Sequence, residues 1–139
     1  HISQEGRQFI IEEFGWCDDV PTLIDAIEKY EVENFSYDKT YAMPLIQDFD
    51  FDEFLEAKKG VCWELSAFAK CVIHEISLAK KWNVSNYIVD VIDNGTIYSF
   101  DMTVAVDQHK SWIHSFQGNS LDDIYRYAGK LKDDVYRVH

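Results

Sequence analysis

The residue in this sequence best suited to chemistry is Cys62, which follows Gly60-Val61 and opens a long segment without proline. At the start of a helix the backbone N–H groups are unpaired and the helix dipole is positive, and both features stabilise a thiolate. The same N–H groups can hold an oxyanion. We therefore predict a reactive Cys62 thiol of lowered pKa, with Gly60 allowing a tight turn into the helix. The alternative is that Cys62 is a small buried apolar residue.

A cysteine nucleophile needs a histidine base, and the sequence offers several histidines at different distances. His74 lies about three turns from Cys62 on the same predicted helix, so we predict a structural role for it. His114 lies on a predicted strand, and His109 in the turn before that strand is a second candidate base. Pairing the strands around this turn places Asp101 opposite His114, where a carboxylate could orient an imidazole.

The N-terminal half is predicted to be mainly helical. Acidic residues and a proline predict a helix over 18–30, whose apolar residues keep a helical period. Residues 7–16 fit a helix or a strand, and 31–50 read as a loop with aromatic anchors. The stretch 48–57 predicts a short acidic amphipathic helix with Asp50 as its N-cap.

The C-terminal half is predicted to contain a long central helix over 62–81 and then an antiparallel meander. An Asn-Gly hairpin signal separates the first two strands. The strands are expected at 87–92, 96–106 and 111–116, and a final helix at 121–128. The apolar stripe of the central helix comprises Val61, Leu65, Phe68, Val72 and Ile76.

Composition narrows the partners of the protein. Its 139 residues carry 25 acidic and 13 basic side chains, a formal charge of −12, which argues against nucleic acid. No apolar run reaches membrane-spanning length. The three cysteines (17, 62 and 71) fit no zinc pattern, and the acids of 48–56 lack the spacing of a calcium loop, so we expect neither a metal nor another cofactor. Free cysteines and the lack of a visible signal peptide favour the cytoplasm.

A family resemblance rests on three features: Gly60-Val61-Cys62 with Ser66, the longer run Lys59–Glu64, and Trp112-Ile113-His114-Ser115-Phe116. Over roughly residues 20–127 the chain resembles the papain-like, transglutaminase-like cysteine enzymes, and more narrowly a bacterial transglutaminase-like group. The resemblance implies an α+β fold in which N-terminal helices and a long central helix pack on an antiparallel meander. We expect one such domain over 1–139.

The resemblance also implies a function. In that family a Cys attacks a carboxamide or peptide carbonyl, a His acts as base, and an acid on the following strand orients it. The family His is expected near 101–103, where this chain has Asp101, and the family acid near 113–114, where it has His114.

In this chain the acid and the histidine thus occupy each other's expected strands, and two interpretations follow. In the first, Cys62, His114 and Asp101 form the site of a cysteine hydrolase or acyl-transferase that acts on peptide or amide bonds of a peptide or protein. Trp63 and Trp112 could line its cleft, although such aromatic residues are more often part of the core. In the second, the site has decayed and the domain binds a protein partner without catalysis.

Overall fold

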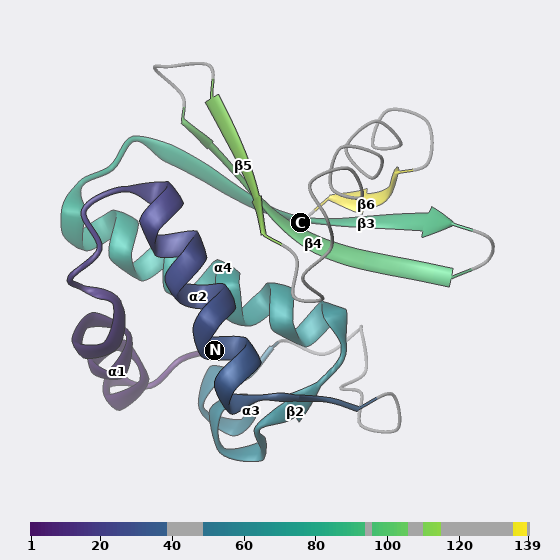
Figure 1. The fold of residues 1–139 in the computed structure, drawn as a ribbon, viewed down its shortest axis with the longest axis horizontal. Helices are drawn as coiled ribbons and strands as arrows, with labels where there is room; N and C mark the ends of the chain where they lie inside the picture. The colour runs from purple at the N-terminus through teal and green to yellow at the C-terminus, as the bar shows by residue number, and fades with distance from the viewer. Residues whose placement is uncertain (39–48, 94–95, 106–109, 115–134, 139) are drawn as a thin grey trace.

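The computed structural model describes residues 1–38, 49–93, 96–105, 110–114 and 135–138 (Figure 1). The described chain is α+β, as predicted. No described helix is both long and apolar enough to cross a membrane. The helices are α1 (Gln4–Phe14), α2 (Val20–Asn34), α3 (Phe51–Ala57) and α4 (Cys62–Lys80).

The strands form two separate sheets. A four-stranded antiparallel sheet has the order β5-β4-β3-β6, and a two-stranded parallel pairing joins β1 to β2. The meander β3-β4-β5 was predicted, whereas β6 was not. The strands are β1 (Ser36–Tyr37), β2 (Lys59–Gly60), β3 (Val84–Asp93), β4 (Thr96–Ala105), β5 (Lys110–His114) and β6 (Val135–Val138).

The helix starts follow local capping rules. Asp19 caps α2 by accepting from the Thr22 N–H at 2.9 Å, so the helix predicted over 18–30 begins at Val20. Asp50 caps α3, as predicted. The segment 7–16, left open between helix and strand, lies largely in α1, which Ser3 caps.

The prediction of a loop over 31–50 is wrong at its start. Helix α2 continues to Asn34, and buried Glu31 belongs to its last turn. The loop prediction rested on weak periodicity, but packing against the core decides where a helix ends. Residues 36–37 form β1, and the predicted loop over 39–48 lies outside the described residues, as does the final helix predicted at 121–128.

The core lies where α1, α2 and α3 pack against α4 (Figure 1). Phe68 of α4 is fully buried and stacks on Phe51 with ring centroids 5.3 Å apart. Phe35 and Phe68 form a T-shaped pair with ring centroids 5.0 Å apart. The predicted stripe of α4 is confirmed for Leu65, Phe68, Val72 and Ile76, which are all fully buried. Its first predicted member, Val61, is instead the N-cap residue and is only partly buried.

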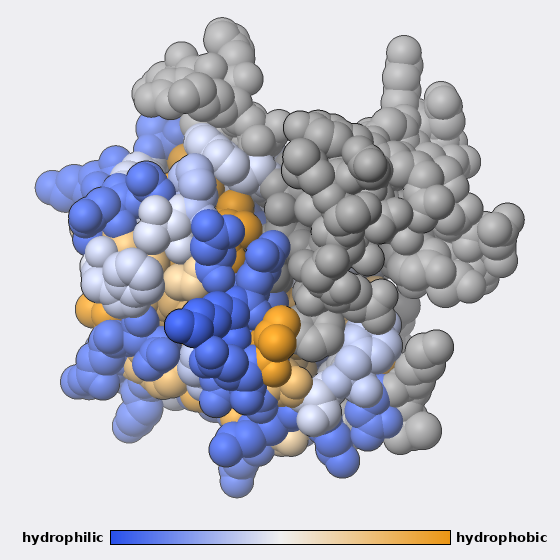
Figure 2. Space-filling view, in the orientation of Figure 1, coloured by the Kyte–Doolittle hydropathy of each residue, from blue (hydrophilic) through white to orange (hydrophobic). Residues whose placement is uncertain are grey.

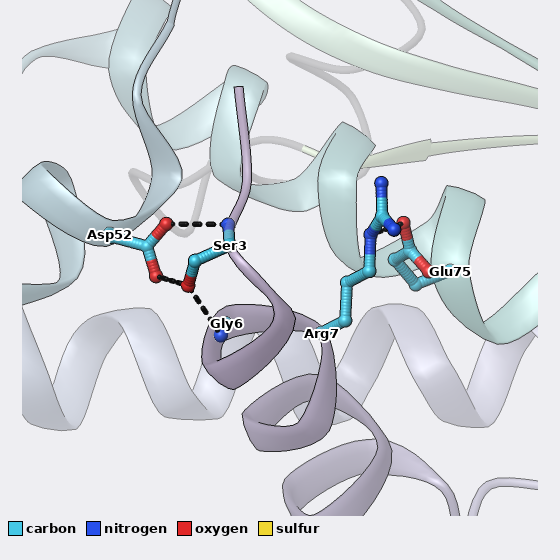
Figure 3. A network of polar contacts seen from close by, with 5 residues as sticks. All are labelled: Ser3, Gly6, Arg7, Asp52 and Glu75. Carbon is cyan, nitrogen blue, oxygen red and sulfur yellow. Dashed lines mark hydrogen bonds and ion pairs between the residues drawn. The ribbon is translucent and has the colours of Figure 1, made fainter.

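The N-terminal segment is fastened to α3 and α4 (Figure 3). The Ser3 hydroxyl donates to Asp52 at 2.6 Å, and the Ser3 N–H donates to the other oxygen of the same carboxylate at 2.8 Å. Arg7 of α1 forms an ion pair with Glu75 of α4 at 3.4 Å. These contacts hold α1 against the central helix.

The sheet packs on α4 mainly through β3 and β4, while β5 also contacts α2 (Figure 1). The residues of β4 that alternate on the side facing α4 are polar: Ser99, Asp101 and Thr103 are all buried. Their neighbours on β3 include Asn86 and buried Asp90. The interface between α4 and the sheet therefore contains a row of hydrogen-bonding side chains, whereas the interface between α4 and the N-terminal helices is rich in aromatic rings.

Candidate active site around Cys62

The chain reaches Cys62 through the short pairing of β1 with β2. The Asp38 N–H donates to the Gly60 carbonyl at 2.9 Å, and Tyr37 pairs with Gly60. This pairing holds the segment after α2 beside the residues that lead into α4. Tyr37 is thereby placed next to Cys62, although the two are far apart in the sequence.

Gly60 has a different role from the one predicted. It lies in β2, so the predicted glycine turn is wrong at this position. A Cβ atom at Gly60 would lie 2.8 Å from the ring of Phe54 and 3.1 Å from the Cβ of Glu64. The glycine is required because β2, α3 and the first turn of α4 approach one another closely.

Cys62 is the first residue of α4, as predicted, with Val61 at the N-cap. The Leu65 N–H donates to the Val61 carbonyl at 3.1 Å. The Glu64 carboxylate accepts from the Val61 N–H at 3.2 Å and is fully buried. A buried carboxylate therefore lies at the positive end of the helix, close to the thiol.

Three donors surround the Cys62 sulfur. The Ser99 N–H of β4 donates to Sγ at 3.4 Å. The Tyr37 side chain and the Trp63 N–H also hydrogen-bond the thiol group. The sulfur thus lies where β1, β4 and the start of α4 meet.

Despite these hydrogen bonds, the pKa of the Cys62 thiol is raised and not lowered. Burial raises the pKa of Cys62 above its ordinary value, and this effect outweighs the hydrogen bonds from Ser99, Tyr37 and Trp63, which lower it. The charge of Glu64 raises the pKa further. The predicted lowering of the pKa by the helix start is therefore wrong, because desolvation and a neighbouring carboxylate oppose the helix dipole.

Asp101 lies two residues from Ser99 on the buried side of β4. Its Oδ1 accepts from the Asn86 amide at 2.8 Å and from the Thr103 hydroxyl at 3.5 Å. Asn86 also donates to the Thr103 hydroxyl at 2.9 Å. Strand neighbours therefore hold the carboxylate in place. Its charge acts on Cys71, farther along α4.

Ser99 is held by its strand neighbour in a similar way. Its hydroxyl donates to the carboxylate of buried Asp90, the residue directly opposite it on β3. The side chain of Ser99 is thus fixed by β3, while its N–H meets the sulfur of Cys62.

The strand register predicted for the candidate base is confirmed. Asp101 pairs with His114 across β4 and β5, and Val104 pairs with Ser111. The side chain of His114 and all of His109 lie outside the described part of the chain. His74 lies exposed in the middle of α4, as expected of a residue that does not serve the thiol.

The two tryptophans predicted to line a cleft are both packed. Trp63 is 6% exposed, and its ring lies 6.1 Å from Phe49. Its indole nitrogen is buried and meets no acceptor among the described residues. Trp112 is partly buried against the core cluster and pairs with Thr103. A substrate-binding role for either ring stays a prediction.

Tyr37 and Ser99 were not predicted as site residues. Tyr37 reads as one aromatic residue among several in a poorly periodic stretch, and only the β1–β2 pairing brings it to Cys62. Ser99 acts through its backbone N–H, which carries no residue-specific signal. Nothing local in the sequence marks either position.

The described ranges of the chain show how possible metal ligands are arranged. Within the described ranges, no three His, Cys, Asp or Glu side chains are grouped so that they could hold a metal ion.

Comparison with known proteins defines the class of fold. The structure is similar to that of a candidate cysteine protease from Cytophaga hutchinsonii, with a TM-score of 0.60 and 12% identity over 82% of this chain. It is also similar to a candidate protease from Parabacteroides distasonis, with a TM-score of 0.56 and 14% identity over 81% of this chain. The described fold is thus protease-like.

These likenesses cover only part of the two known structures. The match spans 37% of the first protein and 23% of the second. No family model matches the sequence, and no curated protein matches it.

Proposed function

We propose that this domain is a cysteine hydrolase or acyl-transferase that acts on peptide or amide bonds, with Cys62 as its nucleophile. The observation that carries the proposal is the position of Cys62 at the first residue of the central helix, with its sulfur facing β4. The likeness to two candidate cysteine proteases supports it at the level of the fold. The finer likeness to transglutaminase-like enzymes is part of the proposal.

The raised pKa of Cys62 dictates how such a reaction would proceed. At neutral pH the thiol keeps its proton, so a base must remove the proton as the sulfur attacks. In the proposal His114 is that base, and Asp101, which pairs with it across the strands, orients the imidazole. The side chains that hold Asp101 would then be positioning residues.

The proposed steps conserve atoms and charge. The thiol proton passes to the imidazole as the Cys62 sulfur bonds to the carbonyl carbon. The carbon–nitrogen bond then breaks, and the leaving amine takes the proton from the imidazolium. Water hydrolyses the resulting thioester in a hydrolase, and a second amine attacks it in an acyl-transferase, so that the thiol is restored.

The test is mass spectrometry of a glutamine-containing peptide library incubated with the protein and methylamine. Peptide cleavage, deamidation and amine incorporation each change the peptide mass differently, so one assay covers all three reactions. We expect product with the wild-type protein and none with Cys62→Ala, while circular dichroism shows that the variant stays folded. Equal product from both proteins would contradict the proposal.

The second candidate function is a non-catalytic domain that binds a protein partner. The observation that favours it is the raised pKa of a thiol whose hydrogen bonds come from Ser99, Tyr37 and Trp63. This candidate predicts that Cys62→Ser leaves the pKa of the His114 imidazole unchanged in NMR titrations. A shift of that pKa in the variant would count against the binding module, because it would show that thiol and imidazole interact.

A further inference from the structure

A groove outside the Cys62 site lies between α1 and α2. Its volume is about 390 Å³, which falls within the range of roughly 300–1,000 Å³ found for ligand pockets. Three aromatic residues and three carboxylates line it: Phe14, Trp16, Tyr30, Glu13, Asp25 and Glu33. We call it the α1–α2 groove.

The three aromatic residues that line the groove differ in their exposure to solvent. Phe14 is 1% exposed and Tyr30 is partly buried, with ring centroids 5.7 Å apart. Trp16 is 64% exposed, and its indole N–H donates to the Glu13 carbonyl at 3.0 Å, which fixes the ring at the end of α1. An exposed tryptophan held in this way presents an aromatic face to a ligand.

The charge of the groove is negative. Glu13, Asp25 and Glu33 are exposed carboxylates, and Lys29 is the cation among the lining residues. The charge of Glu13 also acts on the Tyr30 hydroxyl, whose pKa is raised chiefly by burial and further by this carboxylate. Carboxylates therefore line the groove together with the aromatic residues, and they outnumber the ammonium group by three to one.

We propose that the α1–α2 groove binds an arginine side chain of a protein partner. A guanidinium group is planar, stacks on aromatic faces and forms paired hydrogen bonds with carboxylates, so it matches both features of the lining. The excess of carboxylates provides charge complementarity, which the formal charge of −12 reinforces at longer range. The proposal does not depend on the chemistry of Cys62.

Figure 2 shows that hydrophilic residues cover most of the described surface on the face it presents, with apolar residues between them. An acidic protein attracts any cation weakly, so the experiment must separate the groove from the net charge. A matched pair of peptides and a matched pair of variants serve this purpose.

The probe is a blocked glycine peptide with one central arginine, titrated into the ¹⁵N-labelled protein and followed by NMR. The matched peptide carries citrulline, which keeps the shape of arginine without its charge. We expect the Trp16 indole signal to shift and the arginine peptide to bind about tenfold more tightly than the citrulline peptide. Equal affinity for the two peptides would overturn the proposal.

The variants test the location. Trp16→Ala is expected to weaken binding about tenfold, and Glu33→Gln about threefold. Glu56→Gln removes one exposed carboxylate from α3 and should leave the affinity unchanged, because Glu56 is not among the residues that line the groove. Equal weakening by Glu56→Gln and Glu33→Gln would show attraction by net charge alone and would overturn the proposal. The amide spectrum of each variant confirms that it is folded.

Discussion

The two sides of α4 differ in chemistry. On one side the N-terminal helices pack aromatic rings around Phe68, and on the other the sheet presents buried polar residues, among them Ser99 and Asp101. Apolar burial on the first side stabilises the fold without requiring specific partners. On the second side each buried polar group needs a partner, and hydrogen bonds between neighbouring strands hold Ser99 and Asp101 in place. The main stabilising core and the candidate chemistry thus depend on different surfaces of one helix.

The largest effect is expected on the aromatic side. Phe68→Ala removes a fully buried ring that contacts several others, so the free energy of unfolding should fall by about 3–5 kcal/mol. Leu78→Ala is the matched control, since Leu78 is 63% exposed on the same helix and should change stability by less than about 0.5 kcal/mol. Urea denaturation measures both. Similar losses in the two variants would contradict the location of the core.

A smaller effect on the free energy of unfolding is expected from Cys71. Burial raises the pKa of this thiol to about 11, and the charge of Asp101 also raises it. The folded state keeps this thiol neutral, whereas the unfolded chain ionises it near its ordinary value of 9.0. Stability from this source is therefore complete below pH 9.0 and is lost as the pH rises towards 11, by about 2–3 kcal/mol.

Urea denaturation across this pH range tests that expectation. In Cys71→Ser the fall in the free energy of unfolding should be shallower than in the wild type, because serine does not ionise there. The comparison uses the slope with pH, so a constant cost of the substitution does not affect it. Parallel pH profiles for the two proteins would show that Cys71 titrates alike in the folded and unfolded states.

The smallest effect is expected on the pKa of the Cys62 thiol, on the sheet side of α4. The Tyr37 side chain lowers the pKa of Cys62 through its hydrogen bond, although burial raises that pKa overall. Tyr37→Phe should therefore raise the pKa of Cys62 further and slow its alkylation several-fold at a fixed alkaline pH. Alkylation of Cys17 in the same sample is the control. Unchanged or faster alkylation of Cys62 would mean that the hydroxyl does not stabilise the thiolate.

Local patterns predicted much of this fold. The stripe of α4 from Leu65 to Ile76, the helix that became α2, the cap at Asp50, and the register that pairs Asp101 with His114 all follow from short-range periodicity and turn chemistry. Each of these signals involves residues close in sequence or strands joined by a short turn. The end of α2 at Asn34 depended on packing and was missed.

The candidate site was less predictable because it depends on burial and on contacts distant in sequence. The position of Cys62 at the start of α4 was predicted, but the direction of its pKa shift was not. That direction comes from burial against β4 and from the carboxylate of Glu64, neither of which is visible from the position of Cys62 at a helix start. The contact with Tyr37 likewise depends on a parallel pairing of only two residues per strand.

The most direct test of the central claim is the rate of iodoacetamide alkylation at Cys62 against pH, in the wild type and in His114→Ala. Mass spectrometry reads each cysteine separately, so Cys17 and Cys71, whose thiol pKa values are also raised, serve as internal controls. If His114 removes the thiol proton during attack, Cys62 should react near neutral pH about tenfold faster in the wild type than in the variant. If the alkylation rate of Cys62 instead has the same pH dependence in both proteins and rises only at alkaline pH, the catalytic account is contradicted. The result would then favour the second candidate function, a non-catalytic domain that binds a protein partner.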